Sequence, residues 1–491
     1  MARSRTKILF VTSEVYPLVK TGGLADVSAS LPEALRSLNL DVRILMPGYS
    51  AVLQQLSHAR KAALISNVSL YYPDCVLRTG QLASSNVPLL LLDCPTLYGH
   101  PFGPYQDQNG VDLPHNHMRF GLLGYVAALL TGEESPLTWR PDIVHCNDWQ
   151  SGLAPAYLHY QPGPKPPCII TVHNLAFQGI FPPETLPWLG LPPDSFAMNG
   201  LEYYGNISFL KAGLFYADRI TTVSPTYAEE IQHEPLGMGM QGLLATRQSD
   251  LVGILNGIDE QAWNPATDPR IDSHYDADHL DGKRRNKFAL QKRMGLNADL
   301  DAPLLGIVSR LTHQKGIDIV IDVIPQLMAL GCQLAVLGNG DAANTQALSA
   351  YALQYPGKLA VHIGYDEVLS HLITAGIDLF LMPSRFEPCG LNQMYSQRYG
   401  TPPIVSATGG LVDSVTDYSD ENLANATASG IVFHDMSAEG LLTAIDRGLT
   451  AYRDKALWRK LQRAGMLRDF SWKASALRYI ELYRSMIGDH P

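Results

Sequence analysis

The sequence predicts an α/β protein of two Rossmann-like domains facing a central cleft. Short, almost continuously apolar segments alternate with helix-like segments, as in parallel sheets covered by helices on both faces. Polar or glycine-rich turns follow the apolar segments, and such turns are where open α/β sheets bind ligands. This pattern occurs on each side of a polar stretch. We therefore expect domains at 1–260 and 261–469, and a C-terminal helix at 470–491 that packs back across their junction.

The first domain begins with a βαβ pattern in which a helix at about 24–38 connects two apolar strands. Lys20 precedes the pair Gly22 and Gly23, so a cation lies beside a turn whose backbone can approach an anion. The motif GxGxxG is absent, and on local grounds Lys20 fits a surface loop equally well. Strands of this domain are expected at 7–14, 41–47, 87–94, 141–146, 167–172, 219–224 and 251–255.

The second domain follows a polar stretch, 261–300, which we expect to hold a linker and an exposed helix at about 283–294. Strands are expected at 303–309, 333–337, 359–363, 378–383 and 403–405. Because parallel strands end at one edge of a sheet, the residues after them should share that edge. These residues are Arg310, Lys315, Gly340, Tyr365 and Glu387.

The turn at 384–391 has the strongest functional pattern in this domain. Gly390 allows a close backbone approach, and the start of the next helix offers free N–H groups to an anion. Glu387 would repel a phosphate at that point, so a hydroxyl-rich group attached to the phosphate, such as a sugar, is the better partner. The alternative for Glu387 is a solvent-exposed turn residue.

Composition excludes several classes of partner. The chain has 491 residues, 46% of them hydrophobic, and a formal net charge of −10, which disfavours nucleic acid and anionic membranes. No apolar run approaches a membrane span, and the one at 8–11 is too short for a signal peptide. The cysteines are scattered without CxxC spacing, which indicates reduced thiols and a cytoplasmic protein; they are Cys75, Cys94, Cys146, Cys168, Cys332 and Cys389.

Polar residues also follow two strands of the first domain, where Asp148 and His173 are found. His173 has a structural alternative, a hydrogen-bonded histidine at a strand end. The long polar loop at 95–117 is typical of a lid or binding surface. His115 and His117 within it form HxH, but no acidic or cysteine partner stands at ligand spacing, so a metal site is disfavoured. With Arg310 and Lys315 available to neutralise a diphosphate, we expect catalysis without a divalent ion.

Long motifs, in order over about 8–483, resemble the bacterial glycogen synthases and plant starch synthases. They are KTGGLADV at 20–27, DWQSGLAPAYL at 148–158, TVHNLAFQG at 171–179, ISFLKAGLFYADRITTVSPTYAEEI at 207–231, NGID at 256–259, SRLTHQKGID at 309–318 and PSRFEPCGLNQMY at 383–395. The resemblance implies the GT-B type of architecture and a retaining glucosyltransferase. Its substrates would be ADP-glucose and the non-reducing 4-hydroxyl of glycogen or another α-1,4-glucan.

The resemblance also implies roles for single residues. Lys20, the backbone at Gly23, Arg310 and Lys315 would hold the donor diphosphate. Contacts on the donor side would come from Asp26, Asn256, Gly364 and Tyr365, and the glucose hydroxyls would be held by Glu387 with the backbone of Cys389, Gly390 and Leu391. His173 would lie over the transferred sugar, and Asp148 and Tyr105 would line the cleft near the reacting centre. No cofactor or metal is implied.

Two departures limit what can be transferred. Tyr395 is the eighth residue after Glu387, where related retaining transferases often have a second Glu, and Gln150 stands where some synthases have His. Without a paired nucleophile we expect a front-face reaction, with a covalent intermediate on Glu387 or Asp148 as the alternative. Another nucleotide-sugar enzyme, or a glucan-binding scaffold, is the alternative function. Residue chemistry alone leaves ADP and UDP unresolved as the donor nucleotide.

Overall fold

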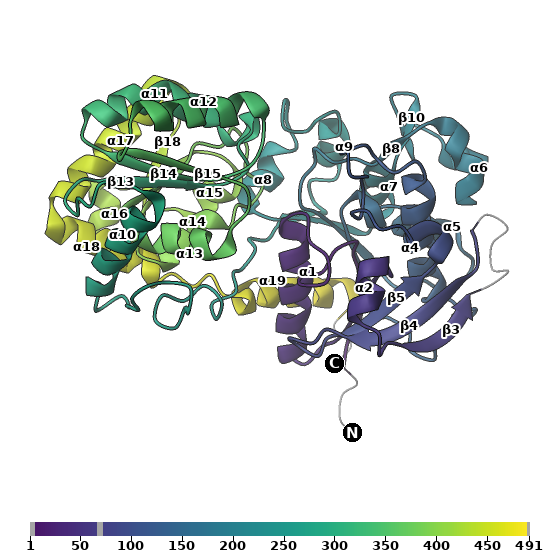
Figure 1. Ribbon diagram of the computed structural model, residues 1–491. Coiled ribbons are helices and arrows are strands. Elements are labelled where there is room, and N and C mark those ends of the chain that lie inside the picture. The colour runs from purple at the N-terminus through teal and green to yellow at the C-terminus, as the bar shows by residue number, and fades with distance from the viewer. Residues whose placement is uncertain (1–4, 66–71, 489–491) are drawn as a thin grey trace. The chain divides into compact units, whose positions relative to one another are not determined.

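The computed structural model describes residues 5–65 and 72–488, which form two compact units (Figure 1). The first unit comprises Met1–Val223, Ala228–Gly257 and Trp472–Pro491, and the second comprises Ser224–Tyr227 and Ile258–Ser471. The chain therefore returns to the first unit after completing the second. Within the described residues, every helix is too short or too polar for a bilayer crossing.

The first unit is built on a sheet that has, among the described residues, nine strands in the order β12-β11-β7-β6-β1-β2-β5-β4-β3. Pairs from β12 to β5 are parallel, and β4 pairs antiparallel with both β3 and β5. The strands are β1 (Lys7–Val11), β2 (Asp41–Pro47), β3 (Arg60–Ile65), β4 (Cys75–Gln81), β5 (Pro88–Asp93), β6 (Ile143–Asn147), β7 (Cys168–Val172), β11 (Arg219–Thr222) and β12 (Leu251–Gly253).

The central strands β6 and β7 are buried along their whole length, which is why they read as apolar runs. Helices connect the strands, and three short strands form a separate antiparallel sheet, β8 (Ile180–Phe181), β10 (Asn206–Ser208) and β9 (Glu202–Tyr203). The helices up to β12 are α1 (Gly23–Ser37), α2 (Ser50–Gln55), α3 (Pro95–Tyr98), α4 (Asn116–Leu129), α5 (Ala154–Tyr160), α6 (Leu186–Leu189), α7 (Phe209–Tyr216), α8 (Pro225–Glu230) and α9 (Gln241–Thr246).

The C-terminal helix α19 (Trp472–Ile487) is bound to the first unit through polar contacts of buried residues. His145 in β6 contacts the Tyr483 hydroxyl through Nδ1 at 2.7 Å and Thr171 Oγ1 through Nε2 at 2.7 Å. Burial lowers the pKa of His145 to about 3, so this histidine is neutral at pH 7. On this helix Leu477 is 45% exposed, whereas Tyr479 is buried.

The second unit contains, in its described residues, a six-stranded parallel sheet in the order β15-β14-β13-β16-β17-β18. Side chains alternate between its faces, so that Leu305 and Ile307 join one apolar core and Leu304 joins the other. The strands are β13 (Leu304–Val308), β14 (Gln333–Gly338), β15 (Leu359–Ile363), β16 (Leu379–Met382), β17 (Pro403–Ser406) and β18 (Ile431–Phe433). The helices are α10 (Asp281–Met294), α11 (Ile317–Ala329), α12 (Ala342–Gln354), α13 (Glu367–Gly376), α14 (Asn392–Arg398), α15 (Gly409–Ser414), α16 (Asp420–Ala424), α17 (Ala438–Arg453) and α18 (Lys455–Met466).

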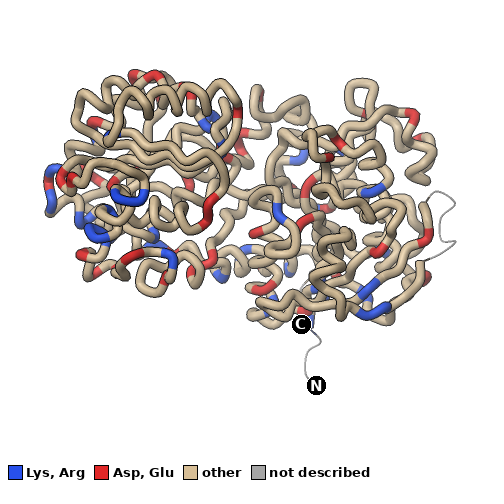
Figure 2. The backbone as a smooth tube through the Cα atoms, viewed as in Figure 1, with Lys and Arg blue, Asp and Glu red and all other residues tan. Residues whose placement is uncertain are grey.

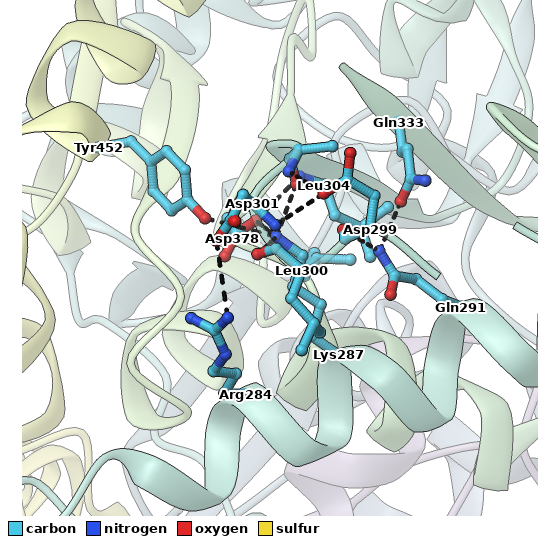
Figure 3. Close-up of polar contacts among 12 residues, drawn as sticks. Arg284, Lys287, Gln291, Asp299, Leu300, Asp301, Leu304, Gln333, Asp378 and Tyr452 are labelled. Carbon is cyan, nitrogen blue, oxygen red and sulfur yellow. Dashed lines mark hydrogen bonds and ion pairs between the residues drawn. The ribbon is translucent and has the colours of Figure 1, made fainter. Parts of the chain in front are cut away.

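The prediction of an exposed helix around 283–294 was wrong in one respect, because one face of α10 is buried although it is polar. Lys287 Nζ donates to Asp378 Oδ2 at 2.7 Å and to the carbonyls of Leu300 and Ala302 at 3.1 and 2.6 Å (Figure 3). The polar composition of this segment predicted exposure to solvent. The polar groups on that face are instead buried, and hydrogen bonds within the protein satisfy them. Lys283 is buried too, and burial lowers its pKa to about 7.

Candidate active site

Most predicted residues of the second unit follow strands that are neighbours at the centre of its sheet. In the strand order, β13 lies between β14 and β16, so the chain direction of successive connections reverses there. Ligands of open α/β sheets bind outside the carboxyl ends of strands at such a switch point. The segment 309–316 follows β13 and the turn 383–391 follows β16, so both lie at this point.

Glu387 and Lys315 form an ion pair between these two loops. Lys315 Nζ lies 2.5 Å from Glu387 Oε2, and the side chains are 16% and 8% exposed. Ser384 Oγ donates to the same carboxylate oxygen at 3.0 Å. Within residues 5–65 and 72–488, no hydrogen bond to the other carboxylate oxygen, Glu387 Oε1, is found, and the Lys315 ammonium makes no second hydrogen bond. The pair therefore keeps acceptor and donor capacity for a ligand.

Arg310 lies at the exposed side of the same edge, and its guanidinium donates to Gln314 Oε1 at 3.2 Å. The β16 loop is fixed beside it by Arg385, which donates from Nη1 and Nη2 to the two carboxylate oxygens of Asp318, both at 2.7 Å. A planar two-bond pair of this kind holds its partners in one orientation. Arg385 therefore positions the loop that carries Glu387, whereas Arg310 remains accessible.

The turn of Cys389, Gly390 and Leu391 packs tightly against a second glycine-rich turn. Gly390 has φ +69°, a left-handed conformation that favours glycine, and Leu391 is the N-cap of α14. A Cβ on Gly409 would lie 2.1 Å from the Glu387 carbonyl oxygen, and one on Gly410 would lie 2.2 Å from that of Cys389. The glycine pair is therefore required for the close approach of these loops.

Gly364 and Tyr365 follow β15, and they connect it to α13. Gly364 has φ +133°, which side-chain-bearing residues rarely adopt. Tyr365 is 82% exposed, so its ring is accessible to a planar ligand group. The structure thus places all the predicted residues of the second unit at the carboxyl edge of one parallel sheet.

In the first unit, the loop after β1 is organised by Glu14, a buried carboxylate. It accepts hydrogen bonds from the Thr21 amide, from Thr21 Oγ1 at 2.6 Å and from the Tyr105 hydroxyl. Lys20 forms an ion pair with Asp26, with Nζ 2.8 Å from Oδ1. The loop thus brings together residues that the sequence related to the site or the glycine turn. Glu14 joins Thr21 to Tyr105, and the neighbouring Lys20 pairs with Asp26.

Gly23 is the first residue of α1, whose N-cap residue Gly22 supplies no side-chain hydrogen bond. A Cβ added at either glycine would meet nothing within 4 Å, so there is open space beside this turn. The uncapped N–H groups and the helix dipole of a 15-residue helix favour an anion there. Lys20 supplies a cation at the same turn.

Asp148 follows β6 in an unusual backbone conformation, with φ 53°. Its carboxylate accepts a hydrogen bond from the His173 amide at 2.7 Å, so it links the ends of β6 and β7. Burial raises the pKa of Asp148 to about 7, because desolvation outweighs the hydrogen bonds from the backbone of His173 and Asn174. A carboxyl with this pKa can be either protonated or ionised near neutral pH.

His173 is neutral, because burial lowers its pKa to about 3. Its Nε2 lies 3.0 Å from Asn147 Oδ1, and the Asn147 amide is oriented by donation from Nδ2 to the Val11 carbonyl at 3.0 Å. Because Oδ1 can only accept, Nε2 carries the proton and Nδ1 has the free lone pair. His173 can therefore accept a hydrogen bond from a hydroxyl but does not act as a general acid at neutral pH.

Asn256 lies at the end of the first unit, three residues after β12, and is buried. Its Oδ1 is buried and has no hydrogen-bond partner in the described structure. An unsatisfied buried amide oxygen is costly, and a ligand donor would remove this cost.

Comparisons with known proteins identify the family. Residues 7–246 match the model of the starch synthase catalytic domain, and residues 290–463 match that of glycosyl transferases group 1. The glycogen synthase of Nitrosomonas eutropha is 56% identical over 484 residues, which are 98% of this chain and 96% of that protein. The chain belongs to the glycogen synthase family. Members of the glycogen synthase family are retaining glycosyltransferases, and this chain is one.

Solved structures support the family's two-domain architecture of the GT-B type. The catalytic domain of starch synthase IV from Arabidopsis thaliana, bound to ADP and acarbose, matches with TM-score 0.86 and 31% identity over 99% of this chain and 100% of that one. Sucrose-phosphate synthase from Thermosynechococcus elongatus shares the fold, with TM-score 0.59 and 19% identity over 98% and 99% of the two chains.

Two features of this site were not predicted from the sequence. Glu14 was regarded as the end of a strand, although a carboxylate within an apolar strand end is itself a signal of a buried polar contact. The six residues Thr21–Asp26 (TGGLAD) recur with one change at Thr408–Asp413 (TGGLVD), and the sequence alone indicates no role for this repeat in the site. In the second unit its glycines allow close packing against the Glu387 turn.

A metal ion was not expected at His115 and His117, whose ring centroids lie 6.3 Å apart. The described residues contain no group of three or more His, Cys, Asp or Glu side chains arranged to hold a metal. The predicted absence of a metal requirement stays a prediction.

Proposed function

We propose that this enzyme elongates an α-1,4-glucan such as glycogen by transferring glucose, with retention of configuration, from ADP-glucose to the non-reducing 4-hydroxyl. The observation that carries the proposal is the Lys315–Glu387 pair at the switch point of the second unit. Its ammonium group suits a phosphate oxygen, and its carboxylate suits sugar hydroxyls. ADP is favoured over other nucleotides because the starch synthase relative has ADP bound.

For the donor diphosphate, the second unit offers Arg310 and Lys315, and the first unit offers Lys20 and the start of α1. These groups stabilise the negative charge that develops as the nucleotide leaves. Four independent donors of this kind make a divalent ion unnecessary. Full activity after dialysis against EDTA is expected, and activity that returns only on adding Mg²⁺ would contradict this part of the proposal.

In the second unit, Glu387 and the backbone of Cys389, Gly390 and Leu391 suit the transferred glucose. In the first unit, the lone pair of His173 Nδ1 suits a sugar hydroxyl as donor. Asp26, Asn256, Gly364 and Tyr365 serve as donor-side contacts, and the exposed Tyr365 ring suits the nucleotide base. Tyr105 and Asp148 lie near the reacting centre.

Retention proceeds by a front-face route, in which the departing phosphate oxygen accepts the proton of the incoming hydroxyl. The C–O bond to the diphosphate breaks and the new glycosidic bond forms on the same face. The neutral His173 fits this route, because the leaving group rather than a protein acid takes the proton. Mass spectrometry with a slow donor tests it, because a glucosylated Glu387 or Asp148 peptide would establish the covalent route instead.

The activity is tested by incubating the protein with labelled ADP-glucose and glycogen and digesting the product with an α-1,4-specific amylase. We expect label in glycogen that the amylase releases completely, and lower transfer from UDP-glucose. Equal or faster transfer from UDP-glucose would overturn the choice of nucleotide. Glycogen binding without transfer would instead support a glucan-binding scaffold.

A cytoplasmic location is part of the proposal. It rests on the bacterial relatives and on six cysteines, all of them buried and none of them in a disulfide bond within the described part of the chain. Cell fractionation with an activity assay of each fraction tests it.

A further inference from the structure

The second unit contains a cationic cavity that none of the predicted site residues lines. It has a volume of about 560 Å³, within the range of small-molecule sites. It lies between the segment around α16 and the C-terminal half of α18. Its lining residues are Thr416, Leu423, Ala426, Thr427, Ala428, Lys460, Arg463, Ala464, Leu467 and Arg468.

The charge of this cavity is opposite to that of the whole chain. Three of its ten lining residues, Lys460, Arg463 and Arg468, are basic, and none is acidic. The chain as a whole has 47 acidic and 37 basic residues. Figure 2 shows Lys and Arg gathered on the part of the second unit that carries α10 and α18 in Figure 1. Cations that share one concave surface repel each other unless an anion lies between them.

Arg468 is the residue most in need of an anion. It is half-buried, and it donates from Nη1 to Thr416 Oγ1 at 2.6 Å. No carboxylate lies within 4 Å of it in residues 5–65 or 72–488, and its remaining N–H groups are not sealed off from solvent. Burial lowers the pKa of Arg468, which reflects the cost of keeping the guanidinium charged there. A guanidinium with free N–H groups suits the planar pair of oxygens of a phosphate.

The other cations are also available. Arg463 contacts Asp278 at 3.3 Å, but these side chains are 55% and 68% exposed, so the contact is weak. For Lys460, the described residues provide no ion pair or hydrogen bond at all. The walls between the cations are apolar, formed by Leu423 and Leu467 among others, and Thr427 adds a hydroxyl. Cations beside apolar walls and a hydroxyl fit a phosphate group that is attached to a small organic molecule, rather than a free multivalent anion.

We propose that this cavity binds a phosphate monoester of a small sugar, with Arg468 and Lys460 contacting the phosphate. The site is separate from the donor site, because its residues lie just after α15 or in and after α16 and α18, rather than at the carboxyl ends of β13 and β16. The competing explanation is that the cations only compensate the negative C-terminal end of the α18 dipole.

The test is isothermal titration calorimetry of the full chain with ribose 5-phosphate, inorganic phosphate and uncharged ribose. Saturating ADP and the Lys315→Ala substitution keep the probes out of the donor site. We expect saturable binding of ribose 5-phosphate, weaker binding of phosphate and none of ribose. Binding should weaken as salt concentration rises.

Variants locate the binding. Arg468→Gln and, separately, Lys460→Gln should each weaken ribose 5-phosphate binding about tenfold or more, as expected for loss of a charge-assisted hydrogen bond. Arg459→Gln is the matched control, because Arg459 lies on the same helix, is exposed and does not line the cavity. It should change affinity less than about twofold.

Three outcomes would overturn the proposal. They are absence of binding to the ADP-saturated protein, equal affinity of ribose and ribose 5-phosphate, and equal weakening by Arg459→Gln and Lys460→Gln. The first outcome is the one expected if the cations serve only the helix dipole. Circular dichroism and melting temperature confirm that each variant is folded. Lys460 is exposed, so Lys460→Gln keeps the test decisive even if Arg468→Gln fails to fold.

Discussion

Two lysine–carboxylate pairs flank the same strand, β16, and differ in how completely the protein satisfies them. Asp378 precedes β16 and pairs with Lys287, whereas Glu387 follows it and pairs with Lys315. The side chains are 3% and 13% exposed in the first pair and 16% and 8% in the second. Burial alone therefore does not distinguish them.

The difference lies in the other partners. Lys287 also donates to the Leu300 and Ala302 carbonyls, and the Asp378 carboxylate accepts from the Leu304 amide at 2.9 Å (Figure 3). Lys287 thus uses all three of its donors on protein atoms. At the other end of the strand, the Lys315–Glu387 pair has unused capacity. A saturated pair fixes structure, and an unsaturated pair at a switch point is available to a ligand.

The largest effect that would test this comparison is on catalysis. Lys315→Ala should lower kcat about 100- to 1,000-fold, because it removes a cation from the leaving phosphate. Steady-state kinetics at saturating donor measure this effect. Lys358→Ala, an exposed lysine of the same unit, is the matched control and should leave kcat unchanged. A folded Lys315→Ala enzyme with normal kcat would remove Lys315 from the site.

The next effect concerns stability. Lys287→Ala should lower the free energy of unfolding by about 3–5 kcal/mol, because Asp378 is left buried without its cation. Urea denaturation measures the loss, and kcat of the folded enzyme should stay within about twofold of normal. Replacing both partners, as Lys287→Met with Asp378→Asn, should be less harmful than Lys287→Ala. If the double variant is the less stable one, the unpaired charge is not the cause.

Asp148 extends the comparison to a carboxyl for which residues 5–65 and 72–488 provide no ion pair. Its pKa is raised to about 7 in the folded state, above its unfolded value, so the folded state binds the extra proton. The stability this group contributes is present at low pH and is lost as pH rises through about 7. Relative to wild type, the free energy of unfolding of Asp148→Asn should rise by up to about 1.4 kcal/mol per pH unit between pH 5 and 7. Above pH 8 the difference between the two proteins should stay constant. Urea denaturation at several pH values measures this, and a difference that is also constant between pH 5 and 7 would contradict the raised pKa.

The smallest effect is expected at the edge of the Lys287 network. Arg284 contacts Asp301 at 3.6 Å, and their side chains are 65% and 90% exposed. Arg284→Ala should change the free energy of unfolding by less than about 1 kcal/mol, since exposed pairs contribute little. It serves as the control for Lys287→Ala on the same helix. Comparable losses in the two variants would show that the helix, and not the buried pair, is the sensitive feature.

Much of the fold could be predicted because parallel strands and their turns are encoded locally. The segment 41–47 was predicted as a strand and is β2, and the segment 359–363 is β15. The edge strand β3 and its neighbour β4 were not predicted, because half-exposed residues give no continuous apolar run. For the site, the sequence indicated Lys315 and Glu387 separately, and the pairing of their loops became visible only in the sheet order.

By itself, the sequence determined the strand-and-turn pattern, the two-unit organisation that it implies, and the residues that carry phosphate and sugar chemistry. These are short-range properties, set by hydrophobic period and by the conformations glycine permits. The tertiary structure alone decided that α10 buries a polar face, that Glu14 connects Thr21 to Tyr105, and that Asp148 titrates near neutral pH. Burial and hydrogen bonding depend on partners that are distant in the chain, so no local pattern encodes them.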